Sequence, residues 1–413
     1  MGDASQDFHY LSISEVSSLI RSHKLSPVEL TRYLINRIQA LDDDLKSFVA
    51  LAAEDAINDA RVAEAEILRG EYKGPMHGIP VAHKDQFDGY KQPSGCRPED
   101  SISEIWLEEA TAVKKLRESG SIYFGKLEMD GLAVGHGPTR QRDLARNPWD
   151  LKRTPGGSSS GSGAAVAAGL VMGSLGEDTA GSIRFPAACC GLVGLKPTYG
   201  LVSRKGLVPL SWSLDHGGPI TRTIEDNALM LQSCAGYDSL DPTSVRVPIP
   251  DYSSGIGRDI KDMVIGFPKD FVNHPDGALE DETRNAVQKS LEELETLGAR
   301  VQEVHIPNLG QSVMANIVIW YSEAFAPRAE DLNQRPEMFG DAMRGILRLG
   351  SLFTAADYIN AQRTRTVVSS QLAEVLQDVD VLALPTLPWP APVASDISPA
   401  SLLAGMHNLI YFM

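Results

Sequence analysis

The chain has 413 residues, of which 43% are hydrophobic and 22% charged. This composition excludes intrinsic disorder and is typical of a folded protein with two domains or one large one. The 38 basic and 54 acidic residues give a formal charge of −16, which argues against general nucleic-acid binding because that depends on basic surface. No short repeat runs through the sequence, so a collagen-like or coiled-coil architecture is also excluded.

The N-terminus and the cysteines favour a cytoplasmic protein with no membrane partner. The first residues contain no apolar stretch resembling a signal peptide. Residues 156–176 are uncharged, but seven of them are glycine and five are serine, so this segment is not apolar enough to span a membrane. The cysteines Cys96, Cys189, Cys190 and Cys234 lack metal-ligand spacing and are expected to be reduced, buried thiols.

Residues 1–70 are expected to form a helical segment packed on the core. A serine followed three residues later by glutamate occurs at Ser12 and again at Ser26, a pattern that caps helix N-termini. Pro27 takes the first helical position after Ser26, which proline favours. A further helix is predicted over residues 52–68.

Strand and helix signals alternate over residues 71–240, the predicted central part of the fold. Strands are predicted at 79–82 and 122–124, and helices at 111–118, 164–171 and 224–231. After Asp241 several prolines and a Ser-Ser-Gly run indicate a connector. Residues 241–413 are expected to form the remaining α/β part, and the stretch up to residue 306 suggests a lobe beside the main core. Strands are predicted there at 263–267, 299–306 and 379–384, and a helix at 280–297.

Three polar segments carry candidate chemistry. Residues 78–85 end in His-Lys-Asp, residues 155–163 are almost entirely glycine and serine, and residues 176–186 contain Glu-Asp-Thr-Ala-Gly-Ser. Taken singly, each has an ordinary explanation: a solvated lysine, a flexible loop and a turn-forming serine. Their significance therefore depends on their occurring together.

Two functional interpretations of the glycine-rich segment compete with the one developed below. A phosphate-binding loop needs Gly-Lys-Ser/Thr where the helix begins, but this helix begins Gly163-Ala164-Ala165. A nucleophile elbow matches Gly-x-Ser-x-Gly at residues 157–161, but it needs a strand directly before it. The two prolines in residues 147–155 disfavour such a strand, and nothing in the sequence connects Asp215, His216 or His305 to this serine.

Together, the three segments resemble the amidase signature family, over about residues 11–392 and most specifically over 153–198. The resemblance implies an α/β/α layered fold with a central mixed sheet, and an amide hydrolase with a Ser-Ser-Lys triad. It makes Ser182 the nucleophile, Ser158 the bridging serine and Lys84 the base.

The resemblance also implies the surroundings of the triad. The turn Thr179, Ala180, Gly181, Ser182 would supply oxyanion-hole N–H groups, and Asp178 and Arg184 would brace it. Gly135 and His136 resemble a substrate-lining stretch, although a plain turn explains them equally well. The bridging serine of the family follows a cis peptide bond, which here would be Gly157–Ser158.

Elementary chemistry supports the same roles. A serine hydroxyl is a weak nucleophile and needs an adjacent base. A lysine accepts a proton only in its neutral form, which burial favours, and Lys84 follows the apolar strand predicted at 79–82. Ser158 can receive one proton and pass on its own, because a hydroxyl is both donor and acceptor. The reaction is acyl transfer and needs neither a metal nor an organic cofactor.

Three departures from the family pattern affect these expectations. The stretch after Lys84, from Asp85 to Cys96, is a little shorter than usual. Ala180 replaces a glycine, which would introduce strain if that position required a positive φ. The chain also stops at Met413, where the family normally continues into another core strand and part of the substrate pocket. This suggests a truncated product or a short variant.

The main expectation is a hydrolase acting on carbon–nitrogen bonds of a small-molecule amide, through a serine acyl-enzyme, without nucleic acid. The oligomeric state is left open. One alternative is the amidase subunit of a glutamine-dependent tRNA amidotransferase, active only with its partners. Its glutamine-binding positions would lie in the missing C-terminal part, which disfavours it. The other alternative is a catalytically inactive relative.

Overall fold

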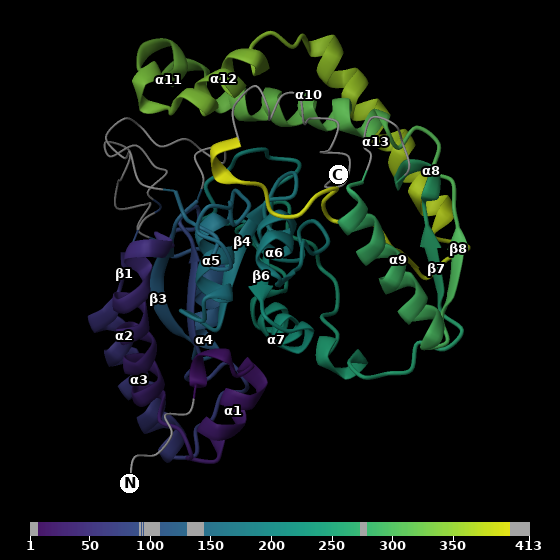
Figure 1. Ribbon diagram of the computed structural model, residues 1–413. Coiled ribbons are helices and arrows are strands. Elements are labelled where there is room, and N and C mark those ends of the chain that lie inside the picture. The colour runs from purple at the N-terminus through teal and green to yellow at the C-terminus, as the bar shows by residue number, and fades with distance from the viewer. Residues whose placement is uncertain are drawn as a thin grey trace. The chain divides into compact units, whose positions relative to one another are not determined.

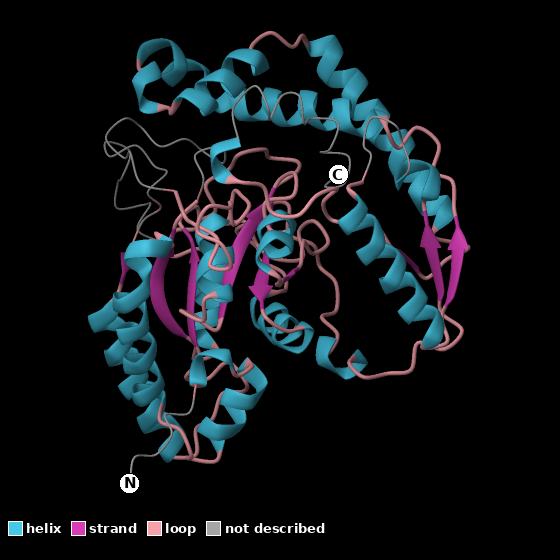
Figure 2. Cartoon of the chain, in the orientation of Figure 1, coloured by secondary structure: helices cyan, strands magenta, loops and turns pink. Residues whose placement is uncertain are grey.

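The computed structural model describes residues 7–90, 92, 94, 108–129, 144–272 and 279–396. The chain divides into two compact units (Figures 1 and 2). The first contains Met1–Pro209, Leu214–Ile256 and Glu337–Gly340, and the second contains Leu210–Ser213, Gly257–Pro336 and Asp341–Met413. The predicted site residues that the structure describes, Lys84, Ser158, Thr179, Ala180, Gly181 and Ser182, belong to the first unit.

The first unit is built on a six-stranded mixed sheet in the order β1-β3-β2-β4-β6-β5. The strands are β1 (Phe48–Leu51), β2 (Pro80–Lys84), β3 (Ile122–Leu127), β4 (Gly173–Asp178), β5 (Val193–Gly194) and β6 (His216–Thr221). β2 runs parallel to both β3 and β4, whereas the β1–β3, β4–β6 and β5–β6 pairs are antiparallel. The predicted α/β fold with a central mixed sheet is therefore confirmed.

The described part of the first unit also contains helices. They are α1 (Ile13–Arg21), α2 (Pro27–Leu45), α3 (Ala53–Leu68), α4 (Thr111–Glu118), α5 (Ser160–Ala167), α6 (Arg184–Cys190) and α7 (Ile224–Cys234), with single 3₁₀ turns at Phe8–Tyr10 and Tyr252–Gly255. Figure 1 shows α2 and α3, in purple, beside the β1 end of the sheet and α5 in front of the sheet near β4. α5 contacts β2, β3, β4 and β6, so it holds the central strands from one side.

The predicted helix starts are confirmed in atomic detail. The Ser12 hydroxyl accepts the Glu15 N–H at 3.1 Å, and the Glu15 carboxylate accepts the Ser12 N–H at 2.7 Å, which is a complete capping box. The Ser26 hydroxyl accepts the N–H groups of Val28 and Glu29 at the start of α2. These bonds satisfy donors that the first helical turn otherwise leaves unpaired.

The helix predicted at 164–171 is present but shifted by four residues: α5 begins at Ser160, inside the glycine-rich stretch, and ends at Ala167. Close packing explains this difference. A Cβ at Gly161 would lie 2.4 Å from the Ser47 carbonyl oxygen and 2.5 Å from the Glu128 nitrogen. Glycine therefore allows the helix to approach neighbouring backbone, an effect that helix propensity does not report.

β3 contains one extra residue opposite β2. Val81 pairs with Tyr123, but His83 pairs with Lys126, so three steps along β3 match two along β2. Gly125 lies within this irregularity with φ +126°, and a Cβ there would lie 2.1 Å from the Ala50 carbonyl oxygen. This is a β-bulge at a position that only glycine fits.

The second unit holds a three-stranded parallel sheet in the order β8-β7-β9. Its strands β7 (Val264–Phe267), β8 (Arg300–Glu303) and β9 (Val381–Leu382) confirm three predicted strands, although the last two are shorter than expected. Its helices are α8 (Lys269–Val272), α9 (Asp281–Thr296), α10 (Gln311–Phe325), α11 (Ala329–Gln334), α12 (Asp341–Gly350) and α13 (Ala355–Val375). Across both units, none of the described helices is long and apolar enough to traverse a lipid bilayer.

Candidate active site

The site forms where two neighbouring parallel strands end. Lys84 is the last residue of β2, and Asp178 is the last residue of β4. The two strands pair directly, with His83 opposite Leu175. Parallel strands bring their carboxyl ends to the same edge of a sheet, which is where α/β proteins commonly bind ligands. Residues far apart in the sequence thus meet at one edge.

Lys84 is completely buried and makes three polar contacts. Its Nζ donates to Ser158 Oγ at 2.7 Å, to Glu177 Oε2 at 2.8 Å and to the Glu177 carbonyl oxygen at 3.3 Å. An ammonium group has three protons, so these acceptors satisfy it completely. The structure therefore brings together two of the three residues assigned to the triad, and it adds a carboxylate.

Ser158 lies in the turn before α5. The peptide bond between Gly157 and Ser158 is cis, as the family resemblance implied. Gly156, with φ +81°, lies against the backbone of Pro186, where a Cβ would come within 2.7 Å of Pro186 Cα. Ser158 is almost completely buried, so its hydroxyl is directed to protein groups rather than to bulk water.

Ser182 is partly exposed and lies in the turn after β4. Its backbone carbonyl accepts the Ser159 N–H at 3.2 Å, which joins this turn to the one that carries Ser158. Within the described residues, no hydrogen bond joins the hydroxyls of Ser158 and Ser182. The backbones of the two turns are thus held side by side.

The turn that carries Ser182 is fixed by Asp178. The Asp178 carboxylate accepts the N–H of Gly181 at 2.7 Å and that of Ile183 at 3.1 Å, and it forms a two-pronged ion pair with Arg184. Burial alone would raise the pKa of Asp178, but the charge and hydrogen bonds of Arg184 and the two N–H groups lower it below its usual range. A buried anion therefore organises the turn.

Ala180 does not carry the strain that its side chain could have caused. The positive φ in this turn belongs to Gly181, at +110°, and Ala180 is not among the non-glycine residues with positive φ in the described part of the chain. Because the Gly181 N–H is bound to Asp178, the N–H groups of Ala180 and Ser182 are the better candidates for contacting an oxyanion.

Glu177 was not identified as a site residue from the sequence. Its buried carboxylate contacts Lys84 through one oxygen, and its other oxygen lies 2.6 Å from Thr179 Oγ1. Thr179 Oγ1 also lies 2.7 Å from Asp215 Oδ1. Its position could have indicated a role in the site, because Glu177 is one residue before the end of β4, the strand that pairs with the strand carrying Lys84.

The remaining expectations have different outcomes. Gly135 and His136 lie outside the described residues. The nucleophile-elbow alternative fails because Ser159 is fully buried and its hydroxyl bonds to the Glu177 backbone. Asp215 contacts Thr179, and His216 contacts the Leu214 carbonyl, so neither activates that serine.

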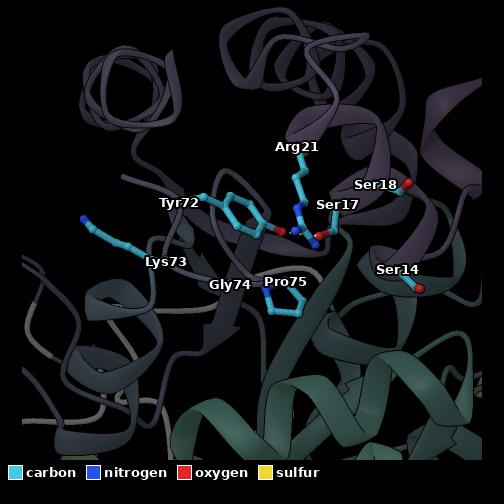
Figure 3. Close-up of a pocket in the computed structure, with 8 residues that line it drawn as sticks. All are labelled: Ser14, Ser17, Ser18, Arg21, Tyr72, Lys73, Gly74 and Pro75. Carbon is cyan, nitrogen blue, oxygen red and sulfur yellow. Dashed lines mark hydrogen bonds between the residues drawn. The ribbon is translucent and has the colours of Figure 1, made fainter. Parts of the chain in front are cut away.

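One described pocket lies away from these residues (Figure 3). It has a volume of about 470 Å³ and is lined by the α1 residues Ser14, Ser17, Ser18 and Arg21 and by Tyr72, Lys73, Gly74 and Pro75. Figure 3 shows Arg21, Ser17 and the Tyr72 hydroxyl pointing toward one another, and Ser17 Oγ lies 2.6 Å from that hydroxyl. Residues 72–75 precede the start of β2, so this pocket is not at the strand end that carries Lys84.

The fold and the lysine–serine contact define a class of hydrolase, and comparison with known proteins agrees. The model of the amidase family matches residues 29–413. The chain therefore belongs to the amidase signature family, whose enzymes hydrolyse carbon–nitrogen bonds of amides. The solved structure of a bacterial aryl acylamidase of this family has a TM-score of 0.82 and 27% identity, and the match covers 94% of this chain and 82% of that one.

Other similar proteins carry one shared name, that of a glutamyl-tRNA(Gln) amidotransferase subunit. The protein of this name from Pseudomonas savastanoi pv. phaseolicola is 39% identical over 410 residues, which cover 93% of this chain and 84% of the relative. The one from Geobacter sp. (strain M21) is 38% identical, with coverages of 92% and 83%. The solved structure of the Thermotoga maritima protein has a TM-score of 0.80 and 33% identity, with coverages of 99% and 88%.

These names correct one expectation. The sequence suggested a small-molecule amide as the sole partner and no nucleic acid, partly because of the charge of −16. The relatives are named as subunits of an enzyme that acts on a tRNA, so that expectation is wrong. Net charge is a property of a whole chain, and it says little about a chain that works within a larger assembly.

Proposed function

We propose that this chain is the amidase subunit of a glutamine-dependent tRNA amidotransferase. In this role it hydrolyses the side-chain amide of glutamine and supplies ammonia for the conversion of a mischarged tRNA. The observation that carries the proposal is the shared name of relatives 38–39% identical over more than nine-tenths of the chain. The proposal was the first alternative drawn from the sequence.

The chemistry assigned to the site is serine acyl transfer. Ser182 Oγ attacks the amide carbon while its proton passes to Ser158, which passes its own proton toward Lys84. The oxyanion accepts hydrogen bonds from the Ala180 and Ser182 N–H groups. Loss of one such donor typically lowers kcat about 10²–10³-fold. The proton then returns to the departing nitrogen as the carbon–nitrogen bond breaks, and water hydrolyses the acyl-enzyme.

Three features of the site support these roles. The Lys84–Ser158 distance of 2.7 Å permits direct proton transfer. Ser182 is partly exposed and can meet a substrate, while Lys84 is shielded from water. The Asp178–Arg184 pair holds the nucleophile turn in one conformation.

The proposal places the tRNA mainly on partner subunits. A chain with a formal charge of −16 balances few phosphates by itself, so cationic surface elsewhere in the assembly is required. It also includes a cytoplasmic location, supported by the thiols of Cys189, Cys190 and Cys234, which are buried and free.

The test is purification of the tagged full-length chain from its own cells under mild conditions, followed by identification of the bound proteins. Glutamate release from glutamine and conversion of glutamyl-tRNA(Gln) are then measured for the assembly and for the chain alone. The proposal expects both activities from the assembly and neither after Ser182→Ala. A chain that purifies alone and hydrolyses simple amides but not glutamine would contradict it.

A further inference from the structure

The Lys84–Glu177 contact raises a difficulty for the relay described above. If Lys84 is an ammonium, its Nζ donates to Ser158, to the Glu177 carboxylate and to the Glu177 carbonyl, so all three protons are used. A lysine in this state has no lone pair with which to accept the Ser158 proton. To act as the base, Lys84 must release a proton as it receives one.

Glu177 is placed to take that proton. Its Oε2 lies 2.8 Å from Lys84 Nζ, and both side chains have 0% exposure. Water does not solvate an ammonium or a carboxylate in such an interior. Transfer of a proton from Lys84 to Glu177 neutralises both groups and therefore gives up little hydration energy. The pair can exist as ammonium with carboxylate or as amine with carboxylic acid.

The other oxygen of Glu177 shares one threonine hydroxyl with a second carboxyl group. Thr179 Oγ1 lies 2.6 Å from Glu177 Oε1 and 2.7 Å from Asp215 Oδ1. A hydroxyl has one proton and can donate it to only one of these oxygens. The hydroxyl can form both hydrogen bonds only if one of the two carboxyl groups, Glu177 or Asp215, is protonated and donates to Thr179 Oγ1.

We propose that Glu177 is a positioning residue that holds the relay proton, acting through Lys84. This rests on the proposed function, because it presumes the same triad. As the Ser182 Oγ–carbon bond forms, the Ser182 proton moves to Ser158, the Ser158 proton to Lys84, and a Lys84 proton to Glu177 Oε2. The substrate carbonyl becomes the oxyanion, Lys84 remains an ammonium, and Glu177 becomes neutral. The transfers reverse as the nitrogen leaves.

Several charged or titratable groups surround this pair. They come from β4, from the start of α6 and from the segment that enters β6: Asp178, Arg184, Asp215 and His216. Asp178 is held by Arg184, and burial together with the charge of Lys196 lowers the pKa of His216 to about 4. Neither Asp178 nor His216 titrates near neutral pH, so a change in pH profile on altering Glu177 reports the Lys84–Glu177 pair together with Asp215, which Thr179 joins to Glu177.

The experiment measures the rate at which a fluorophosphonate labels the full chain, between about pH 6 and about pH 9, by intact mass. This reagent reacts with activated serines and requires neither glutamine nor tRNA. The variants are Glu177→Gln, Glu177→Asp and, as a matched control, Glu128→Gln. Glu128 is also buried, and it accepts the Ser160 hydroxyl at 2.8 Å. Circular dichroism and thermal unfolding check that each variant is folded.

Without the carboxylate, labelling should require Lys84 to lose its proton to solvent. The acid limb of the pH–rate profile of Glu177→Gln should therefore move up by about one pH unit or more. Near the acid end, Glu177→Gln should be labelled about tenfold more slowly than wild type. The difference between the two labelling rates should be smaller at high pH. Glu177→Asp should keep the wild-type midpoint at a lower rate. Glu128→Gln should also keep it.

Three results would overturn the proposal. Slower labelling of Glu177→Gln with an unchanged midpoint would give Glu177 a purely structural role. Faster labelling near neutral pH would mean that Glu177 restrains Lys84 rather than assisting it. Absence of labelling in folded wild-type protein would remove the triad itself, and that failure belongs to the proposed function. If Glu177→Gln does not fold, a shifted midpoint in Glu177→Asp overturns the proposal.

Discussion

Asp178 and Arg184 form a two-pronged ion pair at the turn that carries Ser182, with Nε and a terminal nitrogen of the guanidinium 2.9 Å and 2.8 Å from the two carboxylate oxygens. The Asp178 side chain is fully buried and that of Arg184 is 24% exposed. Asp178→Asn should lower the free energy of unfolding by about 3 kcal/mol or more, because it leaves a mostly buried cation without its partner. Denaturant unfolding at neutral pH measures this.

The matched control is Glu71→Gln. Arg69 and Glu71 make the same two-pronged contact at 3.1 Å and 2.8 Å, but both side chains are more than half exposed. The loss there should be far smaller, since water screens an exposed pair. Equal losses at the two sites would show that burial does not set the strength of the Asp178 pair.

The pH dependence of the Asp178 contribution follows from the sign of its shift. The pKa of Asp178 is lower in the folded chain than in the unfolded chain, so its stabilisation is complete above the ordinary carboxylate range. It should be lost as the pH falls below about 4. The difference in unfolding free energy between wild type and Asp178→Asn should therefore shrink in acid, as unfolding at a series of pH values would show.

His83 is expected to destabilise the fold as the solution becomes acidic. Its Nδ1 accepts the Leu175 N–H at 3.2 Å, and burial, aided by the charge of Lys126, lowers its pKa to about 3. Below the usual histidine pKa, the unfolded chain binds a proton that the folded chain does not. Stability should therefore fall by about 1.4 kcal/mol per pH unit between about pH 6.5 and about pH 3. His83→Asn should remove this slope, and an unchanged slope would refute the assignment.

Substitution of Gly156 and of Gly70 by alanine distinguishes backbone strain from steric clash of the added Cβ. Both have positive φ, +81° and +83°, but a Cβ at Gly156 would meet Pro186 Cα at 2.7 Å, whereas nothing lies within 4 Å at Gly70. Gly70→Ala should cost about 1–2 kcal/mol of stability from backbone strain alone. Gly156→Ala should cost clearly more and should slow serine labelling, because Gly156 lies two residues before Ser158. Equal effects on both measurements would argue against the close contact.

The cysteines provide a test of burial. Desolvation raises the pKa of Cys189 and of Cys234 to about 12, and that of Cys190 is raised further. These three thiols should resist a maleimide in the native protein and react fully in denaturant, as peptide mass mapping would show. Rapid native labelling of Cys234 would mean that the helix carrying it opens readily.

Local signals predicted local structure well. The Ser12 and Ser26 caps gave the starts of α1 and α2, and α4 has the bounds predicted from its pattern. The same reasoning missed β4, because Gly173 and Gly176 are poor strand formers. β4 is stabilised by its pairing with β2 and β6, and these strands are too distant in the sequence for local patterns to predict the pairing.

The site was predictable only in part, for a similar reason. The resemblance assigned Lys84 and Ser158 roles that require contact, and the structure places them 2.7 Å apart. Glu177 adjoins Asp178 in a motif already singled out, yet its contact with Lys84 depends on which strand lies beside β2. The expectation of no nucleic-acid partner failed because net charge describes a whole chain and does not show what that chain works with.

Because of the bulge at Gly125, the direction in which the side chains of β3 face depends on the number of residues in the strand as well as on their identity. Beyond it, Lys84 pairs with Leu127, and the Leu127 carbonyl accepts the Asp85 N–H at 2.9 Å. Alternate residues of a strand face opposite sides, so deleting one residue here would reverse every later side chain of β3. An exchange of residues in β3 would therefore be tolerated more readily than the loss of one.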